Sequence, residues 1–536
     1  MQYVVGAPIE RPDVVVLGSG ASGLGTAAVA ARLGRRVLVL EKGEYLGGTS
    51  AVSGGQIWVP VSGQAAERGV EDSAERALEY LEAVARGRSR RELLTAVIAS
   101  GDEMLRFFED ELGIGFKVLT DFPDYRQDLP GAIPGGRTLE PRVYDASGLG
   151  GLMSRVLNDG RAPFTMEEYE QWRAFTRFPW DELADRERRG ITAKGRALVA
   201  MLLSACIETG VSIATGARAL ALQEDDDVVT GVHLEDGTRI EADAVVIATG
   251  GFEWDLPLTD SLVASRVYAR CSPPTNTGDG LRMAQRVGAM TRGTREAWWA
   301  PMSYTGDTRL GEPVGTLLRF ERQGPGSIMV NRHGVRFANE SQNYNDLARA
   351  LQSWDSPNSR PLNTPAHVVF DQGYLERYGI LAHRAGQPTP PYLVEAPTLA
   401  ALAERIGVPS DALEATVERF NGFAREGVDR DFHRGESGYD RYWGDEENPW
   451  PNHSLWPLEQ GPYYAMEVVN GVFGTGGGIA TDGEGRVLDV DARVIPGLYA
   501  VGNATESPYA PGYPGGGATL GPILTLAYLI GRSAGA

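Results

Sequence analysis

A glycine-rich turn with the sequence GSGASG, residues 18–23, lies between an apolar run and an alanine-rich stretch. The apolar run, residues 13–17, is rich in β-branched side chains and is predicted to be a strand. Residues 21–33 are predicted to form a helix, and residues 35–40 a second strand that ends at Glu41. Such a turn brings the start of the helix close to a pyrophosphate, and the acidic residue can bind a ribose hydroxyl. This βαβ unit therefore predicts a dinucleotide-binding domain.

Further glycine-rich segments occur near both ends of the chain, and they account for much of the high glycine content of 68 in 536 residues. Residues 47–55 form a second loop rich in glycine and hydroxyl groups, which a bare nicotinamide-binding fold does not need. Residues 244–251 and 497–503 each read as a buried strand that ends in glycine, and residues 515–521 precede an apolar helix predicted for residues 522–530. The two ends are therefore expected to build one domain around a larger cofactor.

The middle of the chain has a different pattern. Residues 291–460 are richer in Trp, Tyr, Asn and Pro than the two ends of the chain. They also lack the repeated pattern of an apolar strand followed by glycine. We therefore expect an α/β fold with a discontinuous, Rossmann-like cofactor domain, residues 1–290 and 461–536, and an inserted α+β catalytic domain, residues 291–460. Residues 66–210 are mainly helical in pattern, and residues 211–236 suggest a small antiparallel layer.

Charge and cysteine content exclude several functions. The chain has 51 basic and 71 acidic residues, a net charge of −20, so a nucleic-acid partner is not expected. Cys206 and Cys271 form neither a zinc pattern nor a disulfide framework, so we expect two buried thiols and no metal site. No signal peptide or long apolar segment is present, which predicts a soluble, cytoplasmic protein. The polar stretch 181–189 is expected to be a solvated helix face.

Together, several motifs resemble the flavoproteins of the fumarate reductase and 3-ketosteroid dehydrogenase superfamily, over nearly the whole chain. These motifs are GSGASG with Glu41, the glycine loop 47–55, ATGGF at 248–252, NTGDG at 276–280, GLYAVGN at 497–503 and GATLGP at 517–522. The resemblance implies that the cofactor is FAD. It also implies that the N-terminal βαβ unit binds the adenine half and that the C-terminal glycine segment closes over the flavin.

The resemblance also assigns candidate cofactor residues. Gly18, Gly20 and Gly23 would face the pyrophosphate and Glu41 the adenosine ribose. The loop 47–55 would follow the ribityl chain and flavin, and the start of the last helix would stabilise negative charge at the pyrimidine edge. The full expected set is Gly18, Gly20, Ala21, Ser22, Gly23, Glu41, Lys42, Gly48, Thr49, Ser50, Ser53, Gly54, Gly55, Ala248, Thr249, Gly250, Gly280, Gly502, Asn503, Ala518, Thr519 and Leu520.

Within the superfamily, the residues argue against fumarate chemistry. Fumarate reductases use an arginine shortly after an RFxNE segment and a histidine in a THxxGG-like segment. Here Tyr344 stands at the arginine position and residues 474–478 contain no histidine. A dicarboxylate substrate needs paired cations, and both positions lack them. The six histidines, His233, His333, His367, His383, His433 and His453, are scattered and form no recognisable catalytic group.

The tyrosines instead resemble those of the 3-ketosteroid Δ1-dehydrogenases. Tyr125 ends an FPDY segment, Tyr344 ends NESQNY, and Tyr513 and Gly517 lie in YPGGGATLGP. The resemblance implies that the Tyr513 hydroxyl and the Gly517 N–H stabilise the carbonyl oxygen of the substrate, while Tyr344 removes the α proton. Tyr125 would assist Tyr344 and relay the proton outward. The flavin would take the hydride from the β carbon.

The same four residues would serve several substrates. The family pattern puts a 3-ketosteroid first and leaves a small cyclic ketone, such as cyclohexanone or 4-oxocyclohexanecarboxylate, as the alternative. A fumarate or enoate reductase and a non-catalytic flavin-binding module are less favoured. The walls of the pocket are expected near residues 141–180, 298–310 and 380–395. Five aromatic residues are expected to pack a helical layer rather than line a slot: Phe164, Trp172, Phe175, Phe178 and Trp180. An external electron acceptor is expected, either quinone-like or of another kind.

Overall fold

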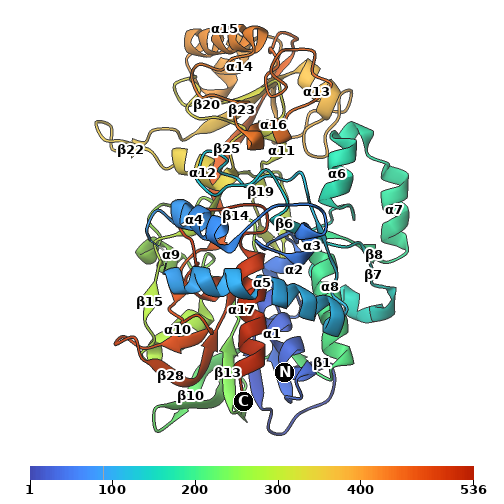
Figure 1. The fold of residues 1–536 in the computed structure, drawn as a ribbon. Coiled ribbons are helices and arrows are strands. Elements are labelled where there is room, and N and C mark those ends of the chain that lie inside the picture. The colour runs from blue at the N-terminus through green and yellow to red at the C-terminus, as the bar shows by residue number, and fades with distance from the viewer. Residues whose placement is uncertain (89, 536) are drawn as a thin grey trace.

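A seven-stranded sheet in the lower half of Figure 1 takes its strands from both ends of the chain. The structure, a computed structural model, describes residues 1–88 and 90–535. The strands lie in the order β1 (Gln2–Val5), β9 (Ser212–Thr215), β3 (Val37–Leu40), β2 (Val14–Leu17), β13 (Ala244–Ile247), β28 (Val494–Ala500) and β27 (Arg486–Leu488). The five central strands are parallel, while both edge strands run antiparallel to their neighbours. This arrangement confirms the predicted α/β fold with a discontinuous cofactor domain.

The βαβ unit forms as predicted, with helix α1 (Ala21–Arg32) between β2 and β3. Side chains on successive residues of β2 enter two different cores. Val14 and Val16 pack beneath the helices, whereas Val15 and Leu17 pack beneath the strands on the other face. A parallel sheet that is covered on both faces has nearly continuous apolar strands, which is why the run 13–17 shows no alternation in sequence.

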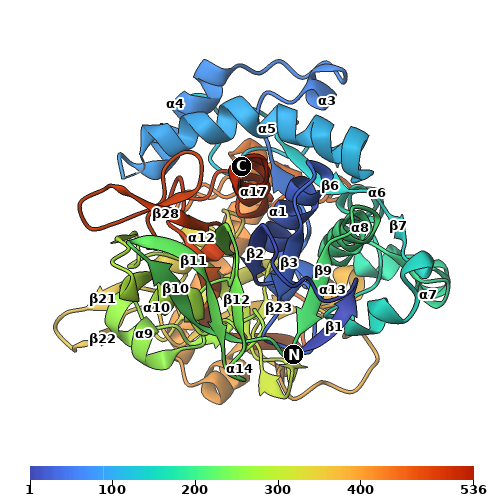
Figure 2. The same cartoon turned by 90° about the horizontal axis from the view of Figure 1, so that it is seen from below.

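Helices α1, α17 (Leu520–Ser533), α8 (Lys194–Glu208) and α5 (Arg91–Leu112) cover one face of the sheet, and α5 crosses over α17 and α1 in Figure 2. Glycine permits the close contact between the first and last helices of the chain. A Cβ added to Gly531 would lie 2.6 Å from the Cβ of Val29, and one added to Gly25 would contact Leu524. The packing of α1 against α17 therefore joins the two ends of the chain directly.

The opposite face of the sheet carries a three-stranded antiparallel layer of β10 (Ala219–Asp225), β11 (Val228–Leu234) and β12 (Arg239–Glu241). The sequence predicts this layer for residues 211–236, but β9, at its start, belongs to the main sheet. Residues 66–210 are largely helical, as expected, and also contribute a small sheet. It is formed by β4 (Ile57–Trp58), β6 (Thr138–Pro141) and β5 (Phe116–Val118).

A second sheet forms the upper half of the molecule in Figure 1. Its strands are β19 (Thr316–Leu317), β16 (Ala297–Ser303), β25 (Tyr463–Thr475), β23 (Ala366–Asp371) and β20 (Ser327–Asn331), and β14 (Ala269–Arg270) and β24 (Val394–Ala396) also pair with β25. The long strand β25 is its centre. Strands of this sheet thus lie on both sides of the expected boundary at residue 460 and before the one at residue 290. The domain limits themselves stay a proposal.

Helices surround this second sheet. They are α11 (Phe320–Gln323), α12 (Tyr344–Ala350), α13 (Gln372–Tyr378), α14 (Leu399–Ile406), α15 (Ser410–Glu426) and α16 (Gly438–Tyr442). The remaining elements are α2 (Gly48–Ala51), α3 (Gly63–Ala66), α4 (Ala74–Ala85), α9 (Leu256–Leu262), α10 (Asp279–Arg286), β7 (Tyr144–Asp145), β8 (Ile191–Thr192), β15 (Thr291–Arg292), β17 (Thr308–Arg309), β18 (Glu312–Pro313), β21 (Trp354–Asp355), β22 (Arg360–Pro361), β26 (Gly478–Ile479) and the 3₁₀ helices η1 (Ser147–Arg155), η2 (Phe175–Arg177) and η3 (Gly502–Ala504).

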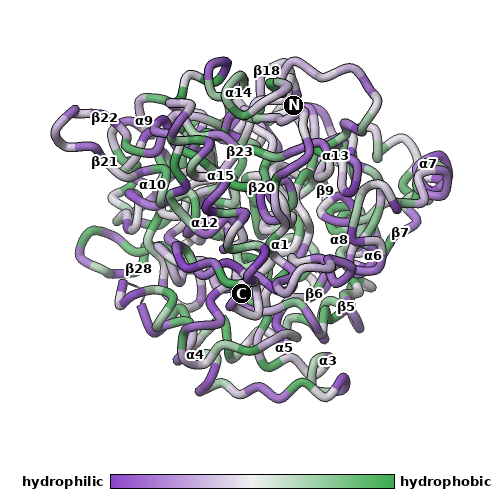
Figure 3. The backbone as a smooth tube through the Cα atoms, turned by 90° about the horizontal axis from the view of Figure 1, so that it is seen from above, coloured by the Kyte–Doolittle hydropathy of each residue, from purple (hydrophilic) through white to green (hydrophobic). Residues whose placement is uncertain are grey.

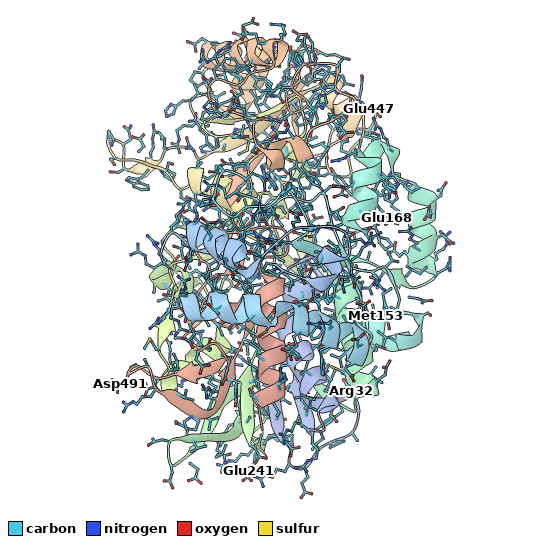
Figure 4. All side chains as sticks on the ribbon, in the orientation of Figure 1. Arg32, Met153, Glu168, Glu241, Glu447 and Asp491 are labelled. Carbon is cyan, nitrogen blue, oxygen red and sulfur yellow. The ribbon has the colours of Figure 1, made fainter. Side chains whose placement is uncertain are left out.

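Helices α6 (Met166–Trp172) and α7 (Trp180–Arg188) form an arm at the edge of the molecule. Only Leu183 of α7 is buried, and α7 is strongly hydrophilic in Figure 3, as the solvated helix face predicted for residues 181–189 requires. Arg177 reaches Glu447 in the upper half, and Figure 4 shows Glu447 above Glu168 of α6. Within residues 1–88 and 90–535, every helix is too short or too polar to span a bilayer.

Candidate active site

A cavity of about 960 Å³ runs between the two sheets and is lined by residues from both. The carboxyl ends of β2 and β13 open onto it through Leu17 and Ala248. Most of the expected cofactor residues line this cavity: Gly18, Gly20, Ser22, Glu41, Lys42, Gly48, Thr49, Ser50, Ser53, Gly54, Gly55, Ala248, Thr249, Gly250, Gly502, Asn503, Thr519 and Leu520. Tyr125, Tyr344, Tyr513 and Gly517 line it as well.

The remaining four expected cofactor residues do not line the cavity. The N–H of Ala21 donates to Ser50 Oγ at 3.1 Å, and the carbonyl of Ala518 accepts from the hydroxyl of Tyr509. Gly23 and Gly280 are packed too tightly for a side chain. A Cβ on Gly23 would lie 2.0 Å from the carbonyl oxygen of Gly18, and one on Gly280 would lie 2.3 Å from Thr249 Oγ1. We propose that these four residues shape the cofactor site rather than contact the cofactor.

The turn after β2 has the form that a pyrophosphate site needs. Gly18 has φ +108°, and a Cβ there would lie 2.4 Å from the carbonyl oxygen of Ala248. Gly20 and Gly48 are less crowded, because the nearest atoms to their added Cβ atoms are 3.8 Å away, an ordinary van der Waals contact. The Thr249 hydroxyl is buried at the cavity wall without a hydrogen-bond partner among the described residues. The site therefore offers both the bare backbone and the free polar group that FAD requires.

Glu41 lies at the end of β3, where the sequence places a ribose ligand. Its Oε2 accepts hydrogen bonds from the backbone N–H and the hydroxyl of Ser19, at 3.1 and 2.6 Å, and its Oε1 accepts from the Gly43 N–H at 2.9 Å. These three hydrogen bonds occupy fewer than the roughly four acceptor sites of a carboxylate, so Glu41 can accept a further donor from a ligand in the cavity. Lys42 pairs with Asp279 at 2.9 Å. We propose that Glu41, held in this way, binds the adenosine ribose.

Tyr125, Tyr344 and Tyr513 form a compact group, which we call the tyrosine cluster. Their ring centroids are 5.6 Å apart for Tyr125 and Tyr344, 5.8 Å for Tyr125 and Tyr513, and 5.2 Å for Tyr344 and Tyr513. All three side chains are buried, and the Tyr513 hydroxyl lies 3.0 Å from Thr519 Oγ1. Three segments that are far apart in sequence thus bring their tyrosines to one end of the cavity.

The loop that carries Tyr125 is tied to the C-terminal glycine segment. The backbone N–H of Tyr125 donates to the carbonyl of Pro514 at 2.8 Å, and the Tyr80 hydroxyl donates to the same oxygen at 2.6 Å. Tyr344 is the first residue of α12, and the Asn343 side chain caps that helix by accepting from the Asp346 N–H. These contacts fix the relative positions of the three rings.

Asp124 stabilises the same loop from below. Its carboxylate accepts hydrogen bonds from Trp58 Nε1 at 2.8 Å, the Ile133 N–H at 3.1 Å and the Arg137 guanidinium at 2.7 Å. Arg137 is buried and also pairs with Asp72 at 2.6 Å. A buried carboxylate is tolerated when its lone pairs are occupied in this way. Neither Asp124 nor Arg137 was identified by the sequence analysis, although Asp124 lies in the FPDY segment quoted for the resemblance.

Gly517 presents its backbone N–H at the cavity. It has φ +84°, and a Cβ there would lie 2.4 Å from both the carbonyl carbon of Gln56 and the amide nitrogen of Ile57. Its carbonyl accepts from the Trp58 N–H at 3.1 Å. Its own N–H has no partner among the described residues. Gly517 and Tyr513 line the same cavity, and an N–H together with a phenol hydroxyl is the kind of donor pair that a developing oxyanion needs.

The tyrosines sit in an environment that opposes their ionisation. Burial raises the pKa of Tyr344 well above its usual value, and the neighbouring Tyr125 and Tyr513 raise it further, whereas Arg319 lowers it. Burial likewise raises the pKa of Tyr125, again with Arg319 acting in the opposite direction. Arg319 lines the same cavity and was not identified from the sequence, where it belongs to no motif. It supplies the nearby positive potential that a tyrosine base requires.

The expected pocket walls also line the cavity. Segments 157–169, 305–310 and 381–392 all contribute side chains. Phe164 both packs against the Phe178 ring, at 4.9 Å between centroids, and lines the cavity, and Trp180 lines it too. The side chain of Phe175 lies outside the described part of the structure. Cys206 and Cys271 are free thiols, and burial raises their pKa values to about 12 and about 11.

Comparison with known proteins agrees with this geometry. The FAD binding domain family matches residues 13–520. The chain is 67% identical to 4-oxocyclohexanecarboxylate 2-dehydrogenase of Sinomonas cyclohexanicum, over 99% of this chain and 94% of that one. It is 36% identical to 3-oxosteroid 1-dehydrogenase of Mycolicibacterium smegmatis (strain ATCC 700084 / mc(2)155), over 99% and 97%.

A solved structure has the same fold. The 3-ketosteroid delta1-dehydrogenase from Sterolibacterium denitrificans, in complex with 1,4-androstadiene-3,17-dione, has a TM-score of 0.90 at 33% identity, covering 98% of this chain and all of that one. The family match and the relatives confirm the predicted FAD cofactor and the predicted resemblance. The chain therefore belongs to the FAD binding domain family, as an FAD-dependent oxidoreductase that acts on CH–CH bonds and is related to the 3-oxosteroid 1-dehydrogenases.

Proposed function

We propose that the protein desaturates a small cyclic ketone that carries a carboxylate, with 4-oxocyclohexanecarboxylate as the type substrate. The identity of 67% to a dehydrogenase of that name, against 36% to a steroid enzyme over the same share of the chain, is the observation that carries this proposal. The 3-ketosteroid, which the sequence analysis put first, becomes the second candidate. It is supported by the likeness to a steroid-bound structure.

The tyrosine cluster suits the first half of such a reaction. The ketone oxygen would accept hydrogen bonds from the Tyr513 hydroxyl and the Gly517 N–H, which stabilise the charge that develops on it when the α proton leaves. The Tyr344 oxygen would take this proton, because its ring lies beside that of Tyr513 in the same buried group. Tyr125 lies next to Tyr344 and would pass the proton on.

The second half of the reaction removes a hydride from the β carbon. FAD, when bound, would supply the hydride acceptor, and the loss of the proton and the hydride would leave the ring with a new double bond conjugated to its carbonyl. The chain contributes the position of the ring: the donor pair fixes the ketone, and the buried rings of the tyrosine cluster exclude water from the reacting carbons. The external electron acceptor, quinone-like or of another kind, stays a prediction.

The proposal is tested by substrate comparison. The purified FAD enzyme is supplied with an artificial electron acceptor and with 4-oxocyclohexanecarboxylate, cyclohexanone or 4-androstene-3,17-dione, and products are identified by mass spectrometry. We expect a product two hydrogens lighter from the carboxylate, formed with the highest kcat/KM of the three. A higher kcat/KM for the steroid would contradict this proposal and favour the second candidate, a 3-ketosteroid substrate.

A further inference from the structure

Several basic side chains line the cavity, although a neutral ring substrate would offer them no counter-charge. Arg161, Arg309 and Arg384, which line it, come from the segments expected to form the substrate walls, and Lys194 and Arg319 line it from outside those segments. A cation taken out of bulk water is costly unless a counter-charge or hydrogen-bond acceptors compensate it. The partners of each of these five side chains therefore show which of them is available to a ligand.

Two of the five have partners near the arm. Arg161 Nε lies 3.2 Å from a carboxylate oxygen of Asp159. The Lys194 amine lies 3.2 Å from the centroid of the Phe164 ring and within 3.4 Å of the carbonyl oxygen of Ala162. Burial lowers the pKa of Lys194 to about 7, so only part of the amine is protonated at neutral pH. Neither side chain is the strongest candidate for binding an anion.

Two more donate to backbone carbonyls. Arg309 donates to the carbonyl of Cys271, and Arg384 donates to the carbonyl of Leu381 at 2.9 Å and to that of His383 at 3.0 Å. The Arg384 guanidinium also lies over the Trp180 ring. Their hydrogen bonds hold the loops at the cavity wall together.

Arg319 differs from these four. Its guanidinium makes no hydrogen bond or ion pair with any residue in the described ranges, and it lies over the face of the Trp443 ring, 5.8 Å from the centroid. Its backbone is fixed, since its N–H donates to the carboxylate of Glu321 at 3.0 Å. The side chain lines the same cavity as Tyr344 and Tyr513. The guanidinium has five N–H donors, and none of them is paired with an acceptor among the described residues, so they are available to a ligand in the cavity.

We propose that Arg319 binds the carboxylate of the substrate and so selects an acidic ring ketone over a steroid. This inference rests on the proposed function. In 4-oxocyclohexanecarboxylate the carboxylate and the ketone stand on opposite ring carbons, so the donor pair of Tyr513 and Gly517 and the guanidinium of Arg319 would hold the ring at both ends. The fork of a guanidinium matches the two oxygens of a carboxylate. A steroid would cover the same cation with apolar rings and leave it without a counter-charge.

The kinetic test compares an acid with its neutral ester. The variant Arg319→Met and the wild type are assayed with 4-oxocyclohexanecarboxylate and with its methyl ester. We expect the ratio of kcat/KM for the acid to kcat/KM for the ester to fall about 10- to 100-fold in the variant, mainly through KM, as the loss of a charge-assisted hydrogen-bonded pair predicts. The variant Arg319→Lys should recover part of the ratio. Equal losses on acid and ester, or an unchanged ratio, would overturn the assignment.

Arg384→Met serves as the matched control, because Arg384 lines the same cavity but donates to backbone carbonyls. We expect its acid-to-ester ratio to stay within about twofold of the wild type. A fall of the ratio in Arg384→Met that equals or exceeds the fall in Arg319→Met would also overturn the assignment, since the carboxylate would then contact the other arginine.

A binding measurement separates this inference from the proposed function. Cyclohexanecarboxylate has the ring and the anion but no ketone, so it cannot be desaturated by the proposed route. Isothermal titration calorimetry of the FAD enzyme should show binding that weakens about 10- to 100-fold in Arg319→Met, with much weaker binding of the neutral cyclohexanecarboxamide. Arg319-dependent binding without turnover of any ring ketone would remove the proposed function and keep the anion site. Binding that does not depend on Arg319 would remove the anion site alone.

Discussion

At the scale of single residues, the buried tyrosine cluster disfavours the phenolate form of Tyr344, and the nearby Arg319 partly offsets this effect. A phenol has an ordinary pKa of about 10 and is a weak base near neutrality. Burial raises the pKa of Tyr344 further, because the anion is poorly solvated there, and Arg319 is the cation that opposes this effect. The balance between desolvation and one nearby guanidinium should therefore control how fast the α proton is removed.

The first prediction concerns pH. Because Tyr344 must be deprotonated to act as base and its folded pKa lies above its usual value, kcat/KM should rise by about tenfold per pH unit between about pH 7 and 9. The variant Arg319→Met, assayed with a neutral ketone, should show the same rise displaced to higher pH. The measurement is the pH profile of flavin reduction under anaerobic conditions. A flat profile over this range would argue against a tyrosine base.

The second prediction concerns the Gly517 N–H. The variant Gly517→Ala places a Cβ 2.4 Å from backbone atoms of residues 56 and 57 at φ +84°, so the segment must shift and the donor must move. We expect a loss in kcat of about 10²–10³-fold, the effect of removing one oxyanion donor. Gly113→Ala is the control, because Gly113 has φ +66° but no atom within 4 Å of an added Cβ. Similar activity in both variants would contradict the assigned role.

At the scale of elements, the sequence predicts those whose pattern is local. The βαβ unit follows from the run 13–17 and the glycine turn after it, because apolar strands and a phosphate-binding turn are encoded in adjacent residues. The place of β25 does not follow in the same way. Its 13 residues pair with strands that begin at residues 269, 297, 366 and 394, and such long-range pairing leaves no mark in a single sequence.

The residues of the candidate site also differ in whether a local sequence pattern predicts them. The tyrosines and Gly517 could be named from their motifs, whereas Arg319 could not, because its role depends on lacking a partner once the chain has folded. The same holds for Lys194: its pKa falls to about 7 because folding buries the amine and brings Arg161 near it, which its sequence neighbours do not indicate.

The third prediction concerns the ion pairs beneath the Tyr125 loop. In Arg137→Met, the carboxylates of Asp72 and Asp124 lose their buried partner. We expect the free energy of unfolding to fall by about 3–5 kcal/mol, measured by urea denaturation. Arg32→Met, which removes the exposed pair of Arg32 with Glu111, should cost at most about 1 kcal/mol. Equal effects would show that the buried group does not stabilise the loop.

At the scale of the whole molecule, the cofactor cavity joins segments from both ends of the chain. Glu41 comes from the first βαβ unit, while Asn503 and Thr519 come from the last strand-and-helix segment. Trp298, at the start of the second sheet, donates to Asn503 Oδ1 at 3.1 Å. A ligand in this cavity therefore contacts parts that are only assembled in the folded protein.

The fourth prediction follows from this assembly. Since FAD binds the folded chain and not the unfolded one, removal of FAD should lower Tm, and addition of FAD at about 100 times its Kd should restore about 2.7 kcal/mol of stability. Differential scanning calorimetry of enzyme with and without FAD measures the shift. The variant Glu41→Ala should need more FAD for the same rise in Tm. A Tm that does not respond to FAD would contradict a site built from both ends.

The most direct test of the central claim is anaerobic reduction of the bound flavin by 4-oxocyclohexanecarboxylate, followed in a stopped-flow instrument by the loss of visible flavin absorbance. We predict rapid bleaching in the wild type, a primary isotope effect when the carbons next to the ketone carry deuterium, and a rate about 10²–10⁴-fold lower in Tyr344→Phe with FAD still bound. Bleaching of Tyr344→Phe at the rate of the wild type, or no bleaching of the wild type by any cyclic ketone, would contradict the account.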